Sequence, residues 1–201
     1  IISLRTDGII IGLFEEEKKL GTAAVAIDKA LEGAITNLIK TGEIKGKLNE
    51  LTIIHSLGKI PARVIAIVGL GKKLKYEIDT VRKITGQACR ALQTTNCHSI
   101  GTVIRGAGVN GLNNVLISQA IVEGAILGLY SYRKHFTTTN EYQEMKELVI
   151  TTNNRSALAK IKQACHKGQI IAEATNFARD LVNEPANYMT PGDMVAVAQK
   201  L

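Results

Sequence analysis

The sequence contains no tryptophan, few other aromatic residues and almost no proline. Only 4% of its 201 residues are aromatic and three are Pro. A core must therefore be built from Ile, Leu, Val and Ala, and neither a proline-rich linker nor a disordered tract is expected. The scarcity of aromatic side chains also removes most of the stacking platforms that single-stranded nucleic acids use.

Cysteine is scarce too, and the three that occur are widely spaced: Cys89, Cys97 and Cys165. An odd number at this spacing argues against a disulfide framework and predicts a reduced, cytoplasmic setting.

No apolar run is long enough to span a bilayer, because three polar residues interrupt the best candidate, 115–129. We therefore expect no membrane partner.

The formal net charge of +7 would suit an acidic partner such as nucleic acid. The basic residues are nevertheless spread along the chain, in short groups such as Lys72, Lys73 and Lys75. This patterning is typical of a solvated basic surface. Nucleic acid is therefore an alternative partner and not the expected one.

Apolar runs and amphipathic stretches alternate along the chain. Strands are predicted at 8–14, 51–57, 64–68, 100–105 and 147–151, and helices at 22–40, 76–93, 113–130 and 155–182. The run 64–68 (VIAIV) has no polar position, which predicts a strand buried on both faces, as in parallel sheets. The alternation predicts an α/β fold with a mixed, mostly parallel sheet flanked by helices.

Local signals refine these elements. Thr22 and Asn113 are predicted N-caps of their helices, and Gly69-Leu70-Gly71 is predicted to form a turn after the buried strand. The helix 155–182 is expected to leave this unit as a connector. Its predicted inner face consists of Leu158, Ile161, Cys165, Ile171 and Phe177.

The segment RGAGVNG, residues 105–111, contains the spacing G-x-G-x-x-G at Gly106, Gly108 and Gly111. It lies between a predicted strand and a predicted helix, as dinucleotide-binding loops do. That fingerprint also needs an acidic residue closing the next strand, whereas the nearest acid at that distance, Glu123, lies within a predicted helix. The pattern favours a tight turn with positive φ and leaves phosphate binding open.

Catalytic constellations are missing from the sequence. The adjacent pairs Cys97-His98 and Cys165-His166 lack a second pair at zinc spacing, and His55 and His135 stand alone. Neither H-E-x-x-H nor G-x-S-x-G occurs. We therefore assign no catalytic, cofactor-binding or metal-binding residue in this chain.

The segment 178–199, ARDLVNEPANYMTPGDMVAVAQ, is the most distinctive part of the sequence. Pro185 disfavours a helical conformation at Glu184. Pro191 suits the first position of a new helix, with Thr190 as its N-cap. The segment is predicted to be a hinge between two helices, held by polar groups.

This segment closely resembles the domain junction of the leucyl aminopeptidase family (M17, cytosol aminopeptidases), where similar text leads into the catalytic domain. Two earlier stretches agree in order. Residues 68–92 are similar to a strand, Gly-Leu-Gly turn and helix of the family's N-terminal domain, and residues 119–135 are similar to its buried helix. The resemblance thus extends over most of the chain.

The resemblance implies a macro-like N-terminal domain at 1–152, a linker helix at 153–184 and the start of a C-terminal catalytic domain at 185–201. It implies a cytoplasmic, hexameric metallo-aminopeptidase that removes N-terminal residues such as leucine from peptides. Two divalent ions (Mn, Zn or Mg) and all catalytic residues would lie in the catalytic domain. Its signatures, of the DSGG and NTDAEGRL kind, do not occur here. The chain is thus expected to be an inactive piece of a longer protein that serves oligomer assembly.

Two alternatives remain. One is a macro-like module that binds ADP-ribose or a nucleotide, since macro domains use a glycine-rich loop for that ligand. The other is a DNA-binding domain that uses Lys72, Lys73 and Lys75, since some bacterial members of the family bind DNA.

Overall fold

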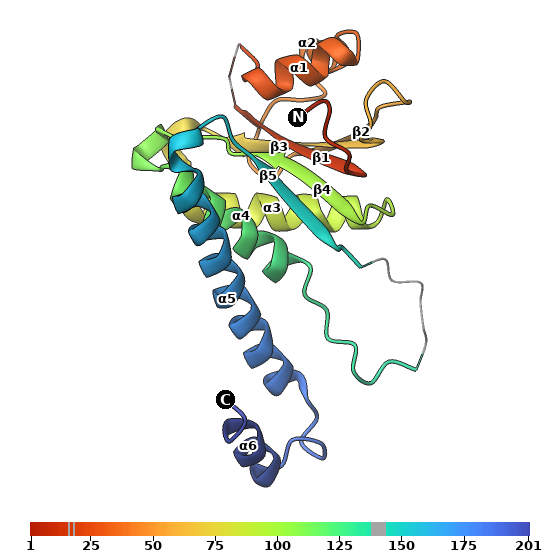
Figure 1. Cartoon of the computed structure of the whole chain (residues 1–201). Helices are drawn as coiled ribbons and strands as arrows, with labels where there is room; N and C mark the ends of the chain where they lie inside the picture. The colour runs from red at the N-terminus through yellow and green to blue at the C-terminus, as the bar shows by residue number, and fades with distance from the viewer. Residues whose placement is uncertain (16, 18, 138–143) are drawn as a thin grey trace.

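The computed structural model describes residues 1–15, 17, 19–137 and 144–201, and its five strands form one sheet in the order β2-β3-β1-β4-β5 (Figure 1). The strands are β1 (Gly8–Phe14), β2 (Leu51–His55), β3 (Val64–Gly71), β4 (Ser99–Val103) and β5 (Glu147–Thr151). β3, β1, β4 and β5 run parallel, and β2 pairs antiparallel with β3. The predicted α/β class with a mixed, mostly parallel sheet is confirmed.

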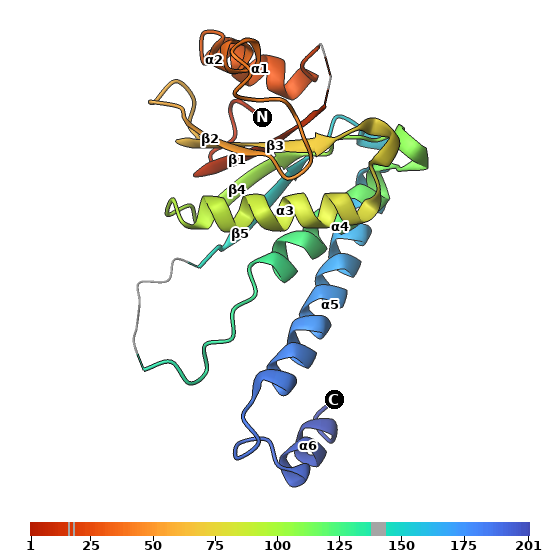
Figure 2. The same cartoon turned by 180° about the vertical axis from the view of Figure 1, so that it is seen from behind.

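Helices cover both faces of this sheet (Figures 1 and 2). The α-helices are α1 (Thr22–Ala30), α2 (Ala34–Lys40), α3 (Ile78–Gln93), α4 (Asn114–Gly128), α5 (Leu158–Asn183) and α6 (Pro191–Ala198). α1 and α2 cover one face, where Ile9 and Ile11 of β1 point, and α3 and α4 cover the other, where Ile10 points. Each face has its own aliphatic core, as the composition predicts.

β3 lies at the centre of both cores. Its residues from Val64 to Gly71 are all buried, which confirms the strand predicted at 64–68. The turn predicted at 69–71 is wrong, because the strand continues through these residues and pairs with β1 as far as Gly71. The chain turns only there, where Gly71 adopts a φ of +71°.

The single helix predicted at 22–40 is in fact two. Glu32 and Gly33 adopt φ angles of 56° and 84°, a left-handed conformation that a continuous helix excludes. The Asp28 carboxylate then accepts hydrogen bonds from the backbone N–H and hydroxyl of Thr36, at 2.9 and 2.5 Å, which fixes the start of α2. Thr22 is not the N-cap of α1 either, since Gly21 occupies that position.

α5 runs parallel to α4 and then extends away from the sheet (Figure 1). The two helices follow successive parallel strands, so their directions agree. Paired residues are about fifty positions apart: the Asn176 amide donates to the Ile126 carbonyl at 3.3 Å, and the Tyr130 hydroxyl to Asp180 at 2.8 Å. At 26 residues, α5 is about 39 Å long, more than the shorter α4 can cover.

The inner face predicted for α5 is largely wrong. Ile161 is buried, but Leu158, Ile171 and Phe177 are exposed. The residues that α5 buries besides Ile161 are small, namely Ala164, Gly168 and Ala172. Apolar periodicity marks a buried face only where a partner is present. α4 packs on the stripe of small residues, and Asn176, next to the exposed Phe177, still reaches the Ile126 carbonyl.

Glycine lets the three helices approach closely. A Cβ at Gly124 of α4 would lie 2.8 Å from Cα of Arg82, and one at Gly86 of α3 would lie 2.9 Å from the Gly124 carbonyl oxygen. A Cβ at Gly168 of α5 would lie 2.7 Å from the Gln119 carbonyl oxygen. Each of these contacts is with backbone, which side-chain rearrangement cannot relieve.

A buried ion pair accompanies the α3–α4 contact. Glu123 is buried and accepts a hydrogen bond from Nε of Arg82 at 2.6 Å, while the Gln119 amide donates to its other oxygen at 2.7 Å. Both carboxylate oxygens are therefore paired, as a buried charge requires. Glu123 thus serves the packing of α4.

We predict that Gly124→Ala destabilises the protein by about 1–3 kcal/mol, because the added methyl group overpacks a backbone–backbone contact. Urea unfolding followed by circular dichroism measures the change. Gly192→Ala is the matched control: Gly192 also lies in a helix, but a Cβ there would meet no atom closer than 3.7 Å. Equal unfolding midpoints for the two variants would contradict the prediction.

Candidate functional site

The glycines of residues 105–111 form a closed turn. Gly106, Gly108 and Gly111 all adopt positive φ, between 76° and 87°, which confirms the turn predicted from the sequence. The amide of Gly108 donates to the Leu112 carbonyl at 2.7 Å, and that of Val109 to the Gly106 carbonyl at 3.0 Å. These N–H groups are therefore engaged within the loop and do not form a phosphate cradle.

The turn is also held against the segment that follows β3. The Asn110 side-chain amide donates to the carbonyls of Lys73 and Tyr76, at 2.7 and 3.0 Å, and the Tyr76 hydroxyl donates to the Arg105 carbonyl at 3.1 Å. A Cβ at Gly106 would lie 2.9 Å from Cζ of the Tyr76 ring. The glycines thus permit a close contact between two loops. Asn113 then caps α4 as predicted, accepting from the amides of Val115 and Leu116.

The lysines proposed for DNA binding lie next to this turn. Lys72, Lys73 and Lys75 are exposed, and Nζ of Lys73 lies 3.4 Å from the Glu17 carboxylate. No contact of these residues indicates a nucleic acid, so that interpretation stays a prediction.

The Cys-His pairs do not come together. Cys97 is buried, while the neighbouring His98 ring forms a 3.1 Å hydrogen bond with the Glu144 carbonyl. Cys165 and His166 lie on α5, a different element. Across residues 1–137 and 144–201, leaving out 16 and 18, no three His, Cys, Asp or Glu side chains gather to hold a metal ion. The resemblance assigns the two-metal centre to the catalytic domain, and we assign no chemical step to a metal in this chain.

A buried, multiply hydrogen-bonded carboxylate lies where α5 ends. Glu184 adopts an extended conformation, as Pro185 predicts, with φ −67° and ψ 127°. Its side chain is only 3% exposed. The carboxylate forms hydrogen bonds with Nζ of Lys134 and Nε2 of His135, each at 2.7 Å. We call Glu184, Lys134 and His135, together with Tyr188, the junction clamp.

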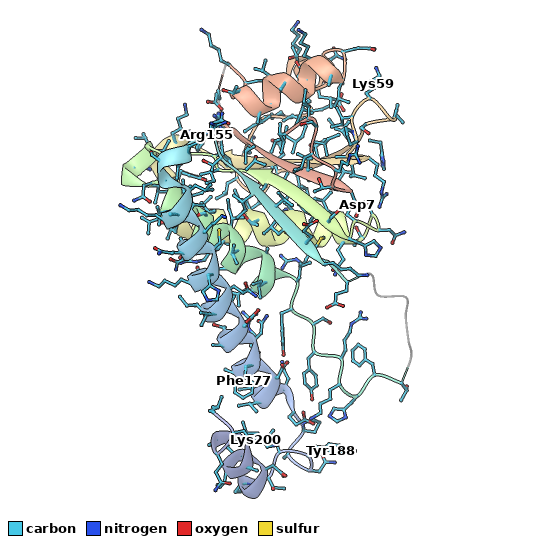
Figure 3. All side chains as sticks on the ribbon, viewed as in Figure 1. Asp7, Lys59, Arg155, Phe177, Tyr188 and Lys200 are labelled. Atoms are coloured by element: carbon cyan, nitrogen blue, oxygen red, sulfur yellow. The ribbon has the colours of Figure 1, made fainter. Side chains whose placement is uncertain are left out.

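Tyr188 completes the clamp from the turn between α5 and α6 (Figure 3). Its ring stacks on His135 with centroids 4.6 Å apart. The chain then enters α6 through a capping box, in which Thr190 and Asp193 exchange hydrogen bonds, with Pro191 at the first helical position. The N-cap predicted at Thr190 is confirmed.

A second set of contacts ties the end of α4 to the last turn of α5. The Tyr130 hydroxyl donates to Asp180 at 2.8 Å and accepts from the Asn183 amide at 2.9 Å. The Arg179 guanidinium lies 5.3 Å from the centroid of the Tyr130 ring, a cation–π distance. The predicted hinge segment, 178–199, is therefore held by the junction clamp and by these contacts of Tyr130.

The sequence did not reveal that Glu184 pairs with Lys134 and His135. From the sequence, His135 is an isolated histidine and Lys134 a solvated cation. No local pattern connects either residue with Glu184, which lies about fifty positions further along the chain. The available signal was indirect: both partners lie in stretches, 119–135 and 178–199, that carry the family resemblance.

The hydrogen bond from Lys134 is the main cause that lowers the pKa of Glu184, from 4.5 to about 2. Burial of the carboxyl group opposes this shift, and the bond from His135 reinforces it. A pKa lower in the folded than in the unfolded state stabilises the fold above pH 4.5, and that stabilisation is lost as the pH falls toward 2. The clamp is therefore intact at neutral pH and weakens in acid.

The structure is thus a three-layered α/β domain whose long helix α5 leads into a turn held by the junction clamp and then into α6. Residues 10–137 match the model of the "Cytosol aminopeptidase family, N-terminal domain". The chain belongs to this family.

Individual relatives agree with the family match. The chain is 34% identical to a probable cytosol aminopeptidase of Alkaliphilus metalliredigens over 100% of its own length and 40% of the relative's. It is 36% identical to one of Sulfurihydrogenibium sp. over 99% of its length and 39% of the relative's. The chain thus spans about 40% of the length of these curated relatives.

Solved structures share the fold. A mutant of tomato leucine aminopeptidase superposes with a TM-score of 0.79 at 19% identity, covering 100% of this chain and 40% of that one. The bottromycin maturation enzyme BotP superposes with a TM-score of 0.73 at 22% identity, covering 97% of this chain and 36% of that one. At these identities the likeness concerns architecture.

We predict that Lys134→Met raises the pKa of Glu184 from about 2 toward its ordinary value, because the variant removes the strongest bond to the carboxylate. A carbon-13 NMR titration of the Glu184 carboxyl group measures both midpoints. Lys162→Met, at an exposed lysine of α5, is the matched control and should leave the midpoint unchanged. A wild-type midpoint at the ordinary pKa of 4.5 would show that the clamp does not form.

Proposed function

We propose that this chain is the N-terminal, non-catalytic part of a two-metal aminopeptidase that removes N-terminal residues such as leucine from peptides. The observation that carries the proposal is the coverage: relatives named cytosol aminopeptidases match nearly all of this chain with only about 40% of their own length. The catalytic residues and the two divalent ions (Mn, Zn or Mg) would then belong to the remaining part of the enzyme. One structural neighbour, BotP, has been solved in complex with Mn.

In this proposal the chain divides into an α/β domain at 1–152, a connecting helix at 153–184 and the first residues of the catalytic domain at 185–201. The sheet supports the first boundary, because its last strand ends at Thr151. The junction clamp supports the second, because it fixes the direction in which the chain leaves α5.

The role we propose for the chain is assembly of a cytoplasmic homo-oligomer, a hexamer in the full-length enzyme. Large apolar side chains on α5, α6 and the turn between them support this role, since they are exposed and suited to contact with further protein. They include Ile170, Phe177, Val182, Tyr188 and Val195. Among the described helices, none has both the length and the apolar character needed to cross a bilayer.

The alternatives have less support. The glycine turn of 105–111 uses its own amides, which removes the sequence argument for an ADP-ribose loop there. The lysines at 72, 73 and 75 are exposed but show no built recognition site. Both interpretations stay predictions.

We predict that the 201-residue chain does not hydrolyse leucine p-nitroanilide in the presence of manganese, because it would lack the catalytic domain. Absorbance of released p-nitroaniline measures turnover, with a full-length aminopeptidase of this family as the positive control. Turnover that persists at constant specific activity through repeated purification would overturn the proposal that this part is non-catalytic.

A further inference from the structure

A cleft of about 620 Å³ opens where the parallel strands β1, β4 and β5 end. Its volume falls in the range of sites for small molecules. Its wall is built from part of β1, the starts of α1 and α4, and the residues where β4 and β5 end. The lining includes Gly12, Gly21–Ala24, Val103–Arg105, Asn114 and Thr151–Asn154.

The position of the cleft follows from the topology of the sheet. β1 and β4 are neighbouring parallel strands, but α1, which follows β1, lies on one face and α4, which follows β4, lies on the other. The connections therefore diverge and leave a crevice at the carboxyl ends of the two strands. In open α/β sheets this switch point is where ligands bind.

The charged side chain that lines the cleft is basic. Among the described residues that line it, none is Asp or Glu, and Arg105 is charged. Nη2 of Arg105 pairs with Glu17 at 2.5 Å, which holds the guanidinium in place. The other side of the guanidinium faces α1: a Cβ at Gly21 would lie 2.5 Å from Nη1.

The start of α1 also favours an anion, because the first N–H groups of a helix carry a partial positive charge. Gly21, at the N-cap, has no side chain to accept hydrogen bonds from the N–H groups of the first turn. Arg155, which directly follows the lining residue Asn154, lies at the same end of the sheet (Figure 3). The small residues Gly21 and Ala23 leave the cleft open, whereas larger side chains there would fill it.

We propose that this cleft binds a small organic anion, with its phosphate or carboxylate group beside Arg105 and the first turn of α1. The body of the ligand would lie against the apolar wall formed by Ile11, Val103 and Ile104. Of the described residues that line this cleft, Arg105 alone belongs to the glycine turn of 105–111. The site is independent of the aminopeptidase reaction proposed above.

Isothermal titration calorimetry on the 201-residue chain tests the proposal with two pairs of probes: AMP with adenosine, and N-acetyl-leucine with N-acetyl-leucinamide. We expect at least one anion to bind about tenfold or more tightly than its neutral counterpart. The pair that shows this difference identifies the preferred group as a phosphate or a carboxylate.

Two variants locate the binding. Ala23→Asp places a carboxylate in the cleft, at a helix position where an acid favours folding, and should weaken binding of the anion about tenfold or more. Val25→Asp is the matched control, because Val25 lies on the same helix, is 50% exposed and does not line the cleft. Circular dichroism checks that both variants fold.

Three results would overturn the proposal. They are no binding of either anion at millimolar concentration, equal affinity for the anion and its neutral counterpart, or an affinity that Ala23→Asp leaves unchanged. Because none of these measurements depends on peptide hydrolysis, their outcome is separate from that of the activity assay.

Discussion

The close contact of α4 with two other helices is the constraint on which the rest of this structure depends. Gly86 and Gly124 bring α3 and α4 to backbone contact, and Gly168 does the same for α4 and α5. Without these approaches α4 could not be enclosed between a helix that covers the sheet and a helix that leaves it. Glu123 shows the same requirement, since its buried carboxylate is stable only while Arg82 of α3 and Gln119 reach it.

The parallel direction of α4 and α5 determines where the polar contacts of the junction fall. Because the helices keep a register of about fifty residues, Tyr130 meets Asp180, and the segment after α4 meets Glu184. Lys134 then neutralises a carboxylate that is almost fully buried, and His135 forms a second hydrogen bond with it. The packing of α4 against α5 therefore determines where the chain bends after α5. Pro185 and the capping box of α6 stabilise that bend.

Elements with a complete local signal could be predicted from the sequence. The unbroken apolar run 64–68 identified the fully buried strand β3, and Asn113 and Thr190 identified two helix starts, because a cap depends on residues within one turn. The break at Glu32–Gly33 was missed because apolar periodicity continues across it. The exposed Phe177 was placed inside because periodicity does not show which side of a helix its partner covers. Pairings such as Glu184 with Lys134, and the cleft itself, depend on strand order, which no local pattern contains.

The same two helices connect the two features that the sequence did not reveal. α4 begins at Asn114, which lines the cleft, and is followed by Tyr130, which binds the end of α5. α5 begins just after Asn154, which also lines the cleft, and ends at Glu184 in the junction clamp. The glycine contact at Gly168 prevents one helix from sliding past the other without a backbone clash. Cleft and clamp are therefore opposite ends of one tightly packed helix pair, and their relative position is as well defined as the packing between them.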